Sequence, residues 1–166
     1  SEDTILKLHK LSRGQIWDAG KYKEQASDII EKYPDGTSRI RFKTVPADRT
    51  AEYMTKLIEM WNRCLREKWV HPMIALAAFN LDFLCIHPFR DGNGRVSRLL
   101  SLLGLYHHGY EVGRYISLER LIEESKEDYY AVLNESSAGW HEGRHDLLPW
   151  LNYFLSIIRR AYRSFE

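Results

Sequence analysis

HPFRDGNGRVSR, residues 87–98, joins two apolar helical patterns. Residues 71–86 are apolar on nearly every side, which predicts a buried central helix, and residues 93–107 carry apolar side chains at helical spacing. Pro88 should end the first helix, because proline disfavours helical geometry at the residue before it. The glycine-rich turn at 92–94 is permissive and leads into the second helix. The stretch therefore predicts a helix–loop–helix at the centre of the molecule.

The start of the second helix is predicted to bind an anion. The backbone N–H groups of residues 92–95 should lie unpaired there, at the positive end of the helix dipole. Arg95 and Arg98 add cations where that dipole disfavours them. A bound polyphosphate would compensate, because its oxygens match the donors of the guanidinium groups.

Two further side chains of the stretch suggest the chemistry. The negative charge of Asp91 lies beside a site predicted to bind an anion. Its presence is explained if Asp91 binds Mg²⁺, because this ion is held by one or two carboxylates together with substrate phosphates. His87 would face the phosphates and could take a proton from an attacking hydroxyl near neutral pH. These residues favour phosphoryl or nucleotidyl transfer. The alternative is a glycine-rich turn whose arginines make surface ion pairs.

The stretch resembles the motif HPFx(D/E)GNGRxxR of Fic domains at every fixed position. Residues 19–23, AGKYK, are similar to the AGxYR segment before the family's hairpin, with Lys23 where arginine is usual. The resemblance extends over roughly residues 5–160. It implies an all-α fold, a helical bundle with a small β-hairpin flap, and a protein adenylyltransferase that moves AMP from ATP to a Ser, Thr or Tyr hydroxyl and releases pyrophosphate.

The resemblance also implies roles for single residues. His87 would be the base, Phe89 would anchor the loop, and Asp91 would bind Mg²⁺. ATP would be held by Gly92, Asn93, Gly94, Arg95 and Arg98, with the Asn93 side chain at the α-phosphate, Arg95 at the α- and β-phosphates and Arg98 at the γ-phosphate. The adenine pocket would be formed by Tyr129, Tyr130, Leu133 and Ser137, although these positions also fit ordinary helix packing.

A flap hairpin is expected at about residues 28–43. Two short runs flank Tyr33-Pro34-Asp35-Gly36, which is a turn signal. By the resemblance, Asp28, Ile29 and Ile30 would dock an extended segment of the target protein by adding a strand. The alternative is a plain hairpin packed on the helices.

Helical patterns cover most of the remaining chain. They are residues 3–13, 50–66, 117–124, 125–134 and 146–162, with no repeat and no low-complexity segment. The whole of residues 1–166 is therefore expected to form a single domain. The chain begins at Ser1 rather than Met, and we expect it to be part of a longer protein.

Composition excludes several classes of function. The 166 residues carry a net charge of +1, which argues against binding nucleic acid by bulk positive charge. No apolar stretch reaches the roughly 20 residues of a membrane span, and no signal peptide is visible. We expect a cytoplasmic protein that binds neither nucleic acid nor membrane. Cys64 and Cys85 lack CxxC spacing and are predicted to be reduced core thiols.

A second motif lies at residues 141–145. The sequence HEGRH matches the HExxH pattern of zinc proteases. That reading needs both histidines on one helix face. Gly139 and Gly143 weaken a helix there, and Asp146 followed by Pro149 indicates a helix start. We therefore expect a polar loop before the last helix.

Regulation and donor stay open from the sequence. Many Fic proteins carry an inhibitory helix, (S/T)xxxE(G/N), whose glutamate pairs with the second motif arginine, and this chain lacks that pattern. Such a helix would come from an upstream segment or another chain, so Arg98 is expected to be unopposed and the enzyme active. Alternatives are transfer of UMP, phosphate or phosphocholine, de-AMPylation, or a silent module that only binds protein.

Overall fold

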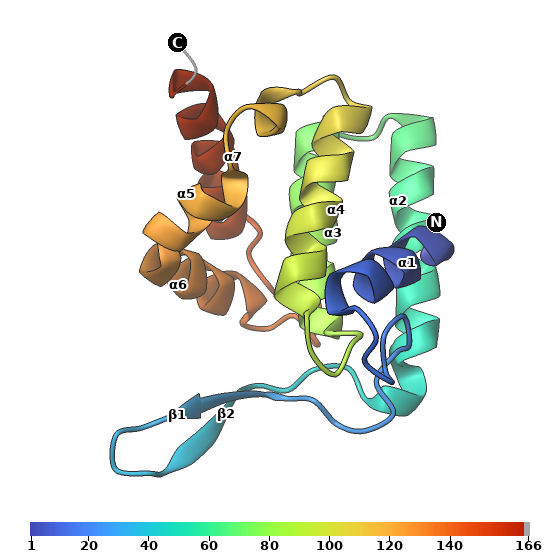
Figure 1. Ribbon diagram of the computed structural model, residues 1–166, viewed down its shortest axis with the longest axis vertical. Coiled ribbons are helices and arrows are strands. Elements are labelled where there is room, and N and C mark those ends of the chain that lie inside the picture. Colours follow the sequence, from blue (N-terminus) through green and yellow to red (C-terminus); the bar gives the residue numbers. More distant parts are fainter. Residues whose placement is uncertain (165–166) are drawn as a thin grey trace.

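A computed structural model describes residues 1–164 as one helical domain with a hairpin that projects from it (Figure 1). The elements within these residues are α1 (Glu2–Arg13), β1 (Ile29–Lys32), β2 (Ser38–Phe42), α2 (Thr50–Glu67), α3 (Pro72–Ile86), α4 (Asn93–His107), α5 (Leu118–Glu124), α6 (Lys126–Ser137) and α7 (Leu148–Arg163), with short 3₁₀ turns at Ala47–Arg49 and Val112–Arg114. This confirms the all-α class with a small hairpin.

Helix α3 is the centre of the fold. It begins at Pro72, a favourable first position, and the His71 side chain accepts a hydrogen bond from the Met73 N–H. Its apolar residues face neighbours on all sides, since α2, α4 and α7 all pack against it. In Figure 1, α3 and α4 stand together between α2 and the group formed by α5, α6 and α7. The loop between α3 and α4 therefore opens at one end of the bundle.

The hairpin lies at the same end of the molecule as that loop (Figure 1). Strands β1 and β2 pair antiparallel, with Ile30 opposite Ile40 and an irregular register between Ile29 and Ile30. The turn closes where the Tyr33 N–H donates to the Thr37 carbonyl and the Thr37 N–H donates to the Asp35 carboxylate. The predicted flap is present, and it has few contacts with the helices beyond its base.

The predicted helices are confirmed, with one correction at the start of α7. Helix α4 begins at Asn93, as predicted, so Gly94 is helical and, of the turn residues 92–94, Gly92 takes a positive φ, of 87°. Helix α7 begins at Leu148, because the Asp146 carboxylate accepts from the Leu148 N–H and so caps the helix from two residues upstream.

No helix within residues 1–164 combines the length and the apolar character that crossing a bilayer requires. Both cysteines are free thiols, with Cys85 buried and Cys64 partly exposed. Burial raises the pKa of the Cys85 thiol far above its usual value.

Candidate functional site

His87 lies directly at the C-terminal end of α3. Its N–H donates to the Phe83 carbonyl at 3.0 Å, and its backbone turns into the left-handed region with φ of 53° and ψ of 61°. A non-glycine residue rarely adopts this conformation. The turn ends the helix ahead of Pro88 and directs the chain into the loop.

The loop is closed by a reciprocal pair of hydrogen bonds between Asn93 and Phe89. The Phe89 N–H donates to the Asn93 side-chain oxygen at 2.9 Å, and the Asn93 amide donates back to the Phe89 carbonyl at 2.7 Å. Both residues are buried, so these bonds satisfy backbone groups that water does not reach. The Asn93 side chain therefore holds the loop, and its backbone N–H is the group left for a ligand.

Helix α1 supports the loop from the other side through His9. The His9 ring stacks on Phe89, with centroids 3.8 Å apart and the planes 2° from parallel. Its Nδ1 accepts from the Gly20 N–H at 2.9 Å, so its Nε2 is the nitrogen that donates to the Asp91 carbonyl, also at 2.9 Å. His9 is buried, and burial lowers its pKa, which favours this neutral form.

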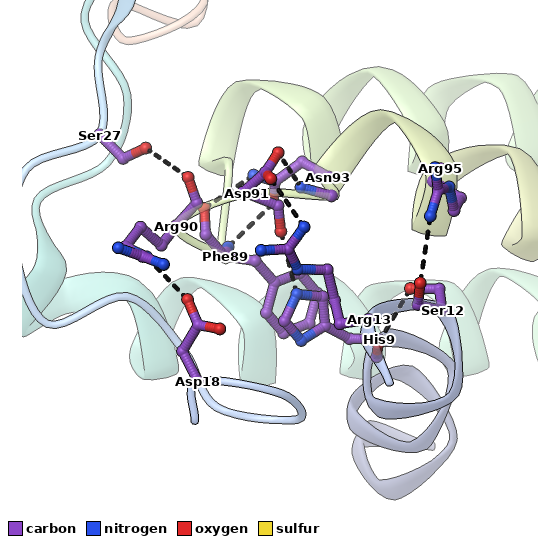
Figure 2. A network of polar contacts seen from close by, with 11 residues as sticks. His9, Ser12, Arg13, Asp18, Ser27, Phe89, Arg90, Asp91, Asn93 and Arg95 are labelled. Carbon is purple, nitrogen blue, oxygen red and sulfur yellow. Dashed lines mark hydrogen bonds and ion pairs between the residues drawn. The ribbon is translucent and has the colours of Figure 1, made fainter. Parts of the chain in front are cut away.

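Charged side chains at the end of α1 contact the loop and the start of α4 (Figure 2). Arg13 donates to one Asp91 carboxylate oxygen at 2.8 Å, and Arg95 donates to the Ser12 carbonyl at 3.1 Å. Arg90 donates to the Asp18 carboxylate at 2.7 Å, which lowers the pKa of Asp18. The loop is thus tied to two segments that lie more than seventy residues away in the sequence.

The start of α4 has free backbone N–H groups, as the predicted anion site requires, with one correction. The other Asp91 carboxylate oxygen accepts the Gly92 N–H at 2.7 Å, so that amide is already paired. The amides of Asn93, Gly94 and Arg95 donate to no acceptor among the residues that the structure describes. Three N–H groups therefore remain at the positive end of α4.

The electrostatics of His87 fit a proton acceptor. Burial and then the positive charge of Lys23 lower the pKa of His87 to about 4. The ring is therefore neutral at pH 7, the form that can accept a proton. Its Nδ1 is buried and has no hydrogen-bond partner in the described part of the chain.

Arg98 is opposed, contrary to the sequence prediction. Its Nε and Nη2 donate to the same Glu119 carboxylate oxygen, at 3.1 and 2.8 Å. Glu119 lies in the first turn of α5, where an acidic residue suits the helix dipole. The chain lacks the inhibitory pattern, but α5 supplies a carboxylate to Arg98 from a different sequence context.

Asp91 is the residue that could hold a divalent cation. Its carboxylate is 67% exposed and lies next to the three free amides, so it could share a cation with bound phosphates. The Arg13 guanidinium already pairs with this carboxylate. Arg13 would therefore have to share the Asp91 carboxylate with a bound cation or release it. Within residues 1–164, no three His, Cys, Asp or Glu side chains cluster in a way that would hold a metal without a substrate.

The four residues expected around adenine all lie in α6 but differ in burial. Tyr129 is buried against Trp150 and Tyr153, and with Arg98 it lines a small cavity of about 40 Å³. Tyr130 is 47% exposed, its ring edge-on to Tyr129. The remaining two, Leu133 and Ser137, also lie in α6, where Leu133 packs against the core and Ser137 is buried.

The flap residues divide into two kinds. Asp28 is an anchor, since its carboxylate accepts from the Thr44 N–H at 3.0 Å at the base of the hairpin. Ile29 pairs with Phe42, while Ile30 is 54% exposed on the projecting part. Ile30 is thus the most accessible apolar group among the three predicted docking residues.

The HEGRH stretch forms turns, as expected from its glycines. His141 lies against the end of β2, where its Nε2 contacts the Lys43 carbonyl and its ring stacks on Phe42. The side chains of His141 and His145 do not share a helix face, so the arrangement required of a zinc protease is not formed. This loop instead supports the base of the flap.

Comparison with known proteins gives a consistent family. The model of the Fic/DOC family matches residues 1–105. The protein adenylyltransferase Fic of Nematostella vectensis is 23% identical over 167 residues, which covers 98% of this chain and 33% of that protein. The protein adenylyltransferase fic-1 of Caenorhabditis elegans is 26% identical over 156 residues, covering 92% of this chain and 26% of that protein.

Solved structures show the same fold. A Fic family protein from Desulfovibrio desulfuricans G20 superposes with a TM-score of 0.77 at 30% identity, over 99% of this chain and 46% of that one. A Fic domain containing signaling protein from Bacteroides thetaiotaomicron VPI-5482 also reaches 0.77, at 24% identity, over 97% of this chain and 60% of that one. The chain spans about a quarter to a third of the two curated relatives named above.

Several residues of the site were not predicted from the sequence. His9 and Arg13 gave no motif, although His9 follows the buried Ile5 by four residues and so shares its helix face. Glu119 lies within the helical pattern predicted at residues 117–124, which gives it no separate role. Lys23 was noted only as a departure from arginine, and its buried side chain places it beside His87.

Proposed function

This chain belongs to the Fic/DOC family, and on that premise we propose that it is a protein adenylyltransferase. It would transfer AMP from ATP to a Ser, Thr or Tyr hydroxyl of a target protein, and to hydroxyls of its own. The relatives named protein adenylyltransferase support this choice of donor, at 23% and 26% identity.

One observation carries the proposal. A neutral, half-buried histidine at the end of α3 opens the loop whose far side is a helix start with three free N–H groups. The loop between them is fixed by the Asn93–Phe89 bonds and by His9. These contacts support the proposal, because phosphoryl and nucleotidyl transfer need a proton acceptor and an anion site at a fixed separation.

The reaction follows from these parts. The target hydroxyl oxygen forms a bond to the α-phosphorus of ATP while the bond from that phosphorus to the bridging oxygen breaks, and pyrophosphate leaves. His87 takes the hydroxyl proton. The amides of Asn93, Gly94 and Arg95, with the guanidinium of Arg95, stabilise the charge on the transferring phosphate. Arg98 would release the Glu119 carboxylate and bind the γ-phosphate in its place.

Mg²⁺ fits the site as a partner of Asp91 and the ATP phosphates. When bound, it would neutralise phosphate charge. The chain's own contribution is to hold the Asp91 carboxylate at the edge of the amide cradle, through the Gly92 N–H.

The flap supplies the surface for the target. The hairpin projects beside the loop, and Ile30 and Ile40 leave apolar surface exposed on it, 54% and 59% respectively. An extended target segment could pair with an open strand edge and bring its hydroxyl to His87.

A labelling experiment tests the donor. The purified chain is incubated with Mg²⁺ and ATP labelled on the α-phosphate, in parallel with ATP labelled on the γ-phosphate. We expect protein-bound label from the α-labelled ATP only. Label from the γ-phosphate would make the enzyme a kinase. Absence of both labels, with ATP bound, would argue for UTP or CDP-choline as donor or for a binding module.

A further inference from the structure

We propose that Lys23 is a positioning residue that holds His87 in its reactive conformation and charge state. The inference rests on the proposed function, because it concerns the base of the same reaction. Lys23 does not lie among the reacting atoms in this account. It acts through the backbone and the ring of His87.

Lys23 brackets His87 from both sides along the chain. Its side-chain ammonium donates to the Ile86 carbonyl at 3.1 Å, and its backbone N–H donates to the Pro88 carbonyl at 2.8 Å. The residues immediately before and after His87 are therefore both held by one residue that is more than sixty positions away in the sequence. No other residue in the described part of the chain donates to both of these carbonyls.

The ammonium also completes the end of α3. Ile86 is the last residue of the helix, so its carbonyl has no partner within the helix. A cation there meets the negative end of the helix dipole. The left-handed backbone of His87 is otherwise strained for a residue with a side chain. By binding the carbonyls of Ile86 and Pro88, Lys23 thus stabilises the strained backbone of His87 on both sides.

Lys23 is buried, with 4% of its surface exposed, and its ammonium also donates to the Thr44 hydroxyl at 2.9 Å. A lysine is almost never fully buried unless its charge is used. Here the positive charge disfavours a second positive charge on the His87 ring, and it does so alongside the burial of the ring. The Leu84 carbonyl and the carboxylates of Asp91 and Asp28 act in the opposite direction.

Lysine differs from arginine at this position in one measurable respect. Burial lowers the pKa of Lys23 to about 8, against the opposing charge of Asp28, so its ammonium loses a proton within an accessible pH range. Arginine would stay charged at every such pH. The titration of Lys23 should therefore be detectable at His87 as a second inflection.

The test follows the His87 ring signals by NMR with pH, in protein labelled at histidine, with His87→Ala to assign them. In the wild type we expect an inflection near pH 4 from the ring itself and a second one near pH 8 from Lys23. In Lys23→Met the lower midpoint should move upward, on the order of one unit, and the upper inflection should vanish. Lys23→Arg should keep the low midpoint and lose the upper inflection.

Transfer from α-labelled ATP gives the second readout. Lys23→Met should lower kcat roughly 10- to 100-fold with little change in KM for ATP, since the phosphate site is untouched. Lys23→Arg should restore most of the rate. The control is Lys21→Met, an exposed lysine two residues away, which should match the wild type in both readouts.

The inference is wrong if Lys23→Met leaves both the His87 midpoint and kcat at wild-type values. If that variant does not fold, the wild type and Lys23→Arg decide: identical His87 titrations without an inflection near pH 8 would overturn it. Should no variant, including the wild type, transfer AMP, the proposed function fails, while the NMR titration still tests whether Lys23 controls His87.

Discussion

Arg98 donates two hydrogen bonds to a single carboxylate oxygen of Glu119, at 3.1 and 2.8 Å. The pair joins the second turn of α4 to the first turn of α5, and the Glu119 side chain is 63% exposed. Exposed ion pairs contribute at most about 1 kcal/mol. A phosphate with two negative charges would therefore displace Glu119 at small cost, so we expect the pair to weaken ATP binding without blocking it.

Replacing Glu119 by Gln should improve ATP binding. The substitution removes the charge that competes with phosphate for Arg98, and we expect KM for ATP to fall by roughly two- to fivefold with kcat unchanged. Steady-state transfer kinetics measure this. Glu123→Gln is the matched control, because Glu123 pairs with Lys126 at 3.4 Å near the other end of α5. An unchanged KM in Glu119→Gln would show that Arg98 does not meet the nucleotide.

Replacing Asn93 by Ala should destabilise the protein. The Phe89 N–H and carbonyl would lose their partners in a buried site, at about 1–3 kcal/mol each, with partial relief if water enters. We expect the free energy of unfolding in urea to fall by about 2–4 kcal/mol. Asn62→Ala, on an exposed position of α2, should cost under about 0.5 kcal/mol. Equal losses in the two variants would refute the role of Asn93 as the bond that closes the loop.

Replacing His9 by Phe separates its stacking from its hydrogen bonds. The ring stack on Phe89 is kept, while the bonds to the Gly20 N–H and the Asp91 carbonyl are lost. Because Asp91 lies at the proposed phosphate site, we expect KM for the ATP–Mg²⁺ complex to rise about tenfold, which corresponds to the loss of one positioning contact of about 1.4 kcal/mol. Wild-type kinetics in this variant would show that stacking alone fixes the loop.

The stability of the fold should fall below neutral pH through His87. The pKa of His87 is lowered from 6.5 to about 4, so between these values the unfolded chain binds more protons than the folded one. Above pH 6.5, His87 does not lower the free energy of unfolding. As pH falls from 6.5 to 4, the free energy of unfolding decreases by up to about 3 kcal/mol. Urea unfolding at several pH values measures the slope.

His87→Gln is the control for that slope. Gln does not titrate in this range, so the decrease should shrink in the variant, leaving the part that comes from His9 and His108, whose pKa values are also lowered by burial. The same pH dependence in wild type and His87→Gln would mean that the ring is not buried in its neutral form.

The sequence predicted the elements of the fold because their signals are local. The apolar run of α3, Pro88 after it and the helical spacing of α4 each act over a few residues. The Pro-Asp-Gly turn set the hairpin in the same way. The predicted turn at 92–94 overlapped the helix predicted from residue 93, and the structure places Asn93 and Gly94 in the helix, because Gly94 tolerates the helix as well as the turn.

The parts of the site that were missed are contacts between distant segments. Arg13 reaches Asp91 and Lys23 reaches Ile86 only once α1 and the segment after it fold across the loop. Glu119 meets Arg98 through the placing of α5. Each is a charged residue of a common type, without spacing that marks its partner, so only the three-dimensional arrangement gives it a role.

The central claim is that His87 takes the proton from the attacking hydroxyl at an ATP site formed by α4. The most direct test compares His87→Ala with wild type in two measurements, the Kd for ATP and the rate of AMP transfer. The account predicts an unchanged Kd and a transfer rate lower by about 10²–10⁴-fold, while the control His107→Ala, at the exposed far end of α4, keeps both values. A transfer rate in His87→Ala equal to that of the wild type would contradict the account.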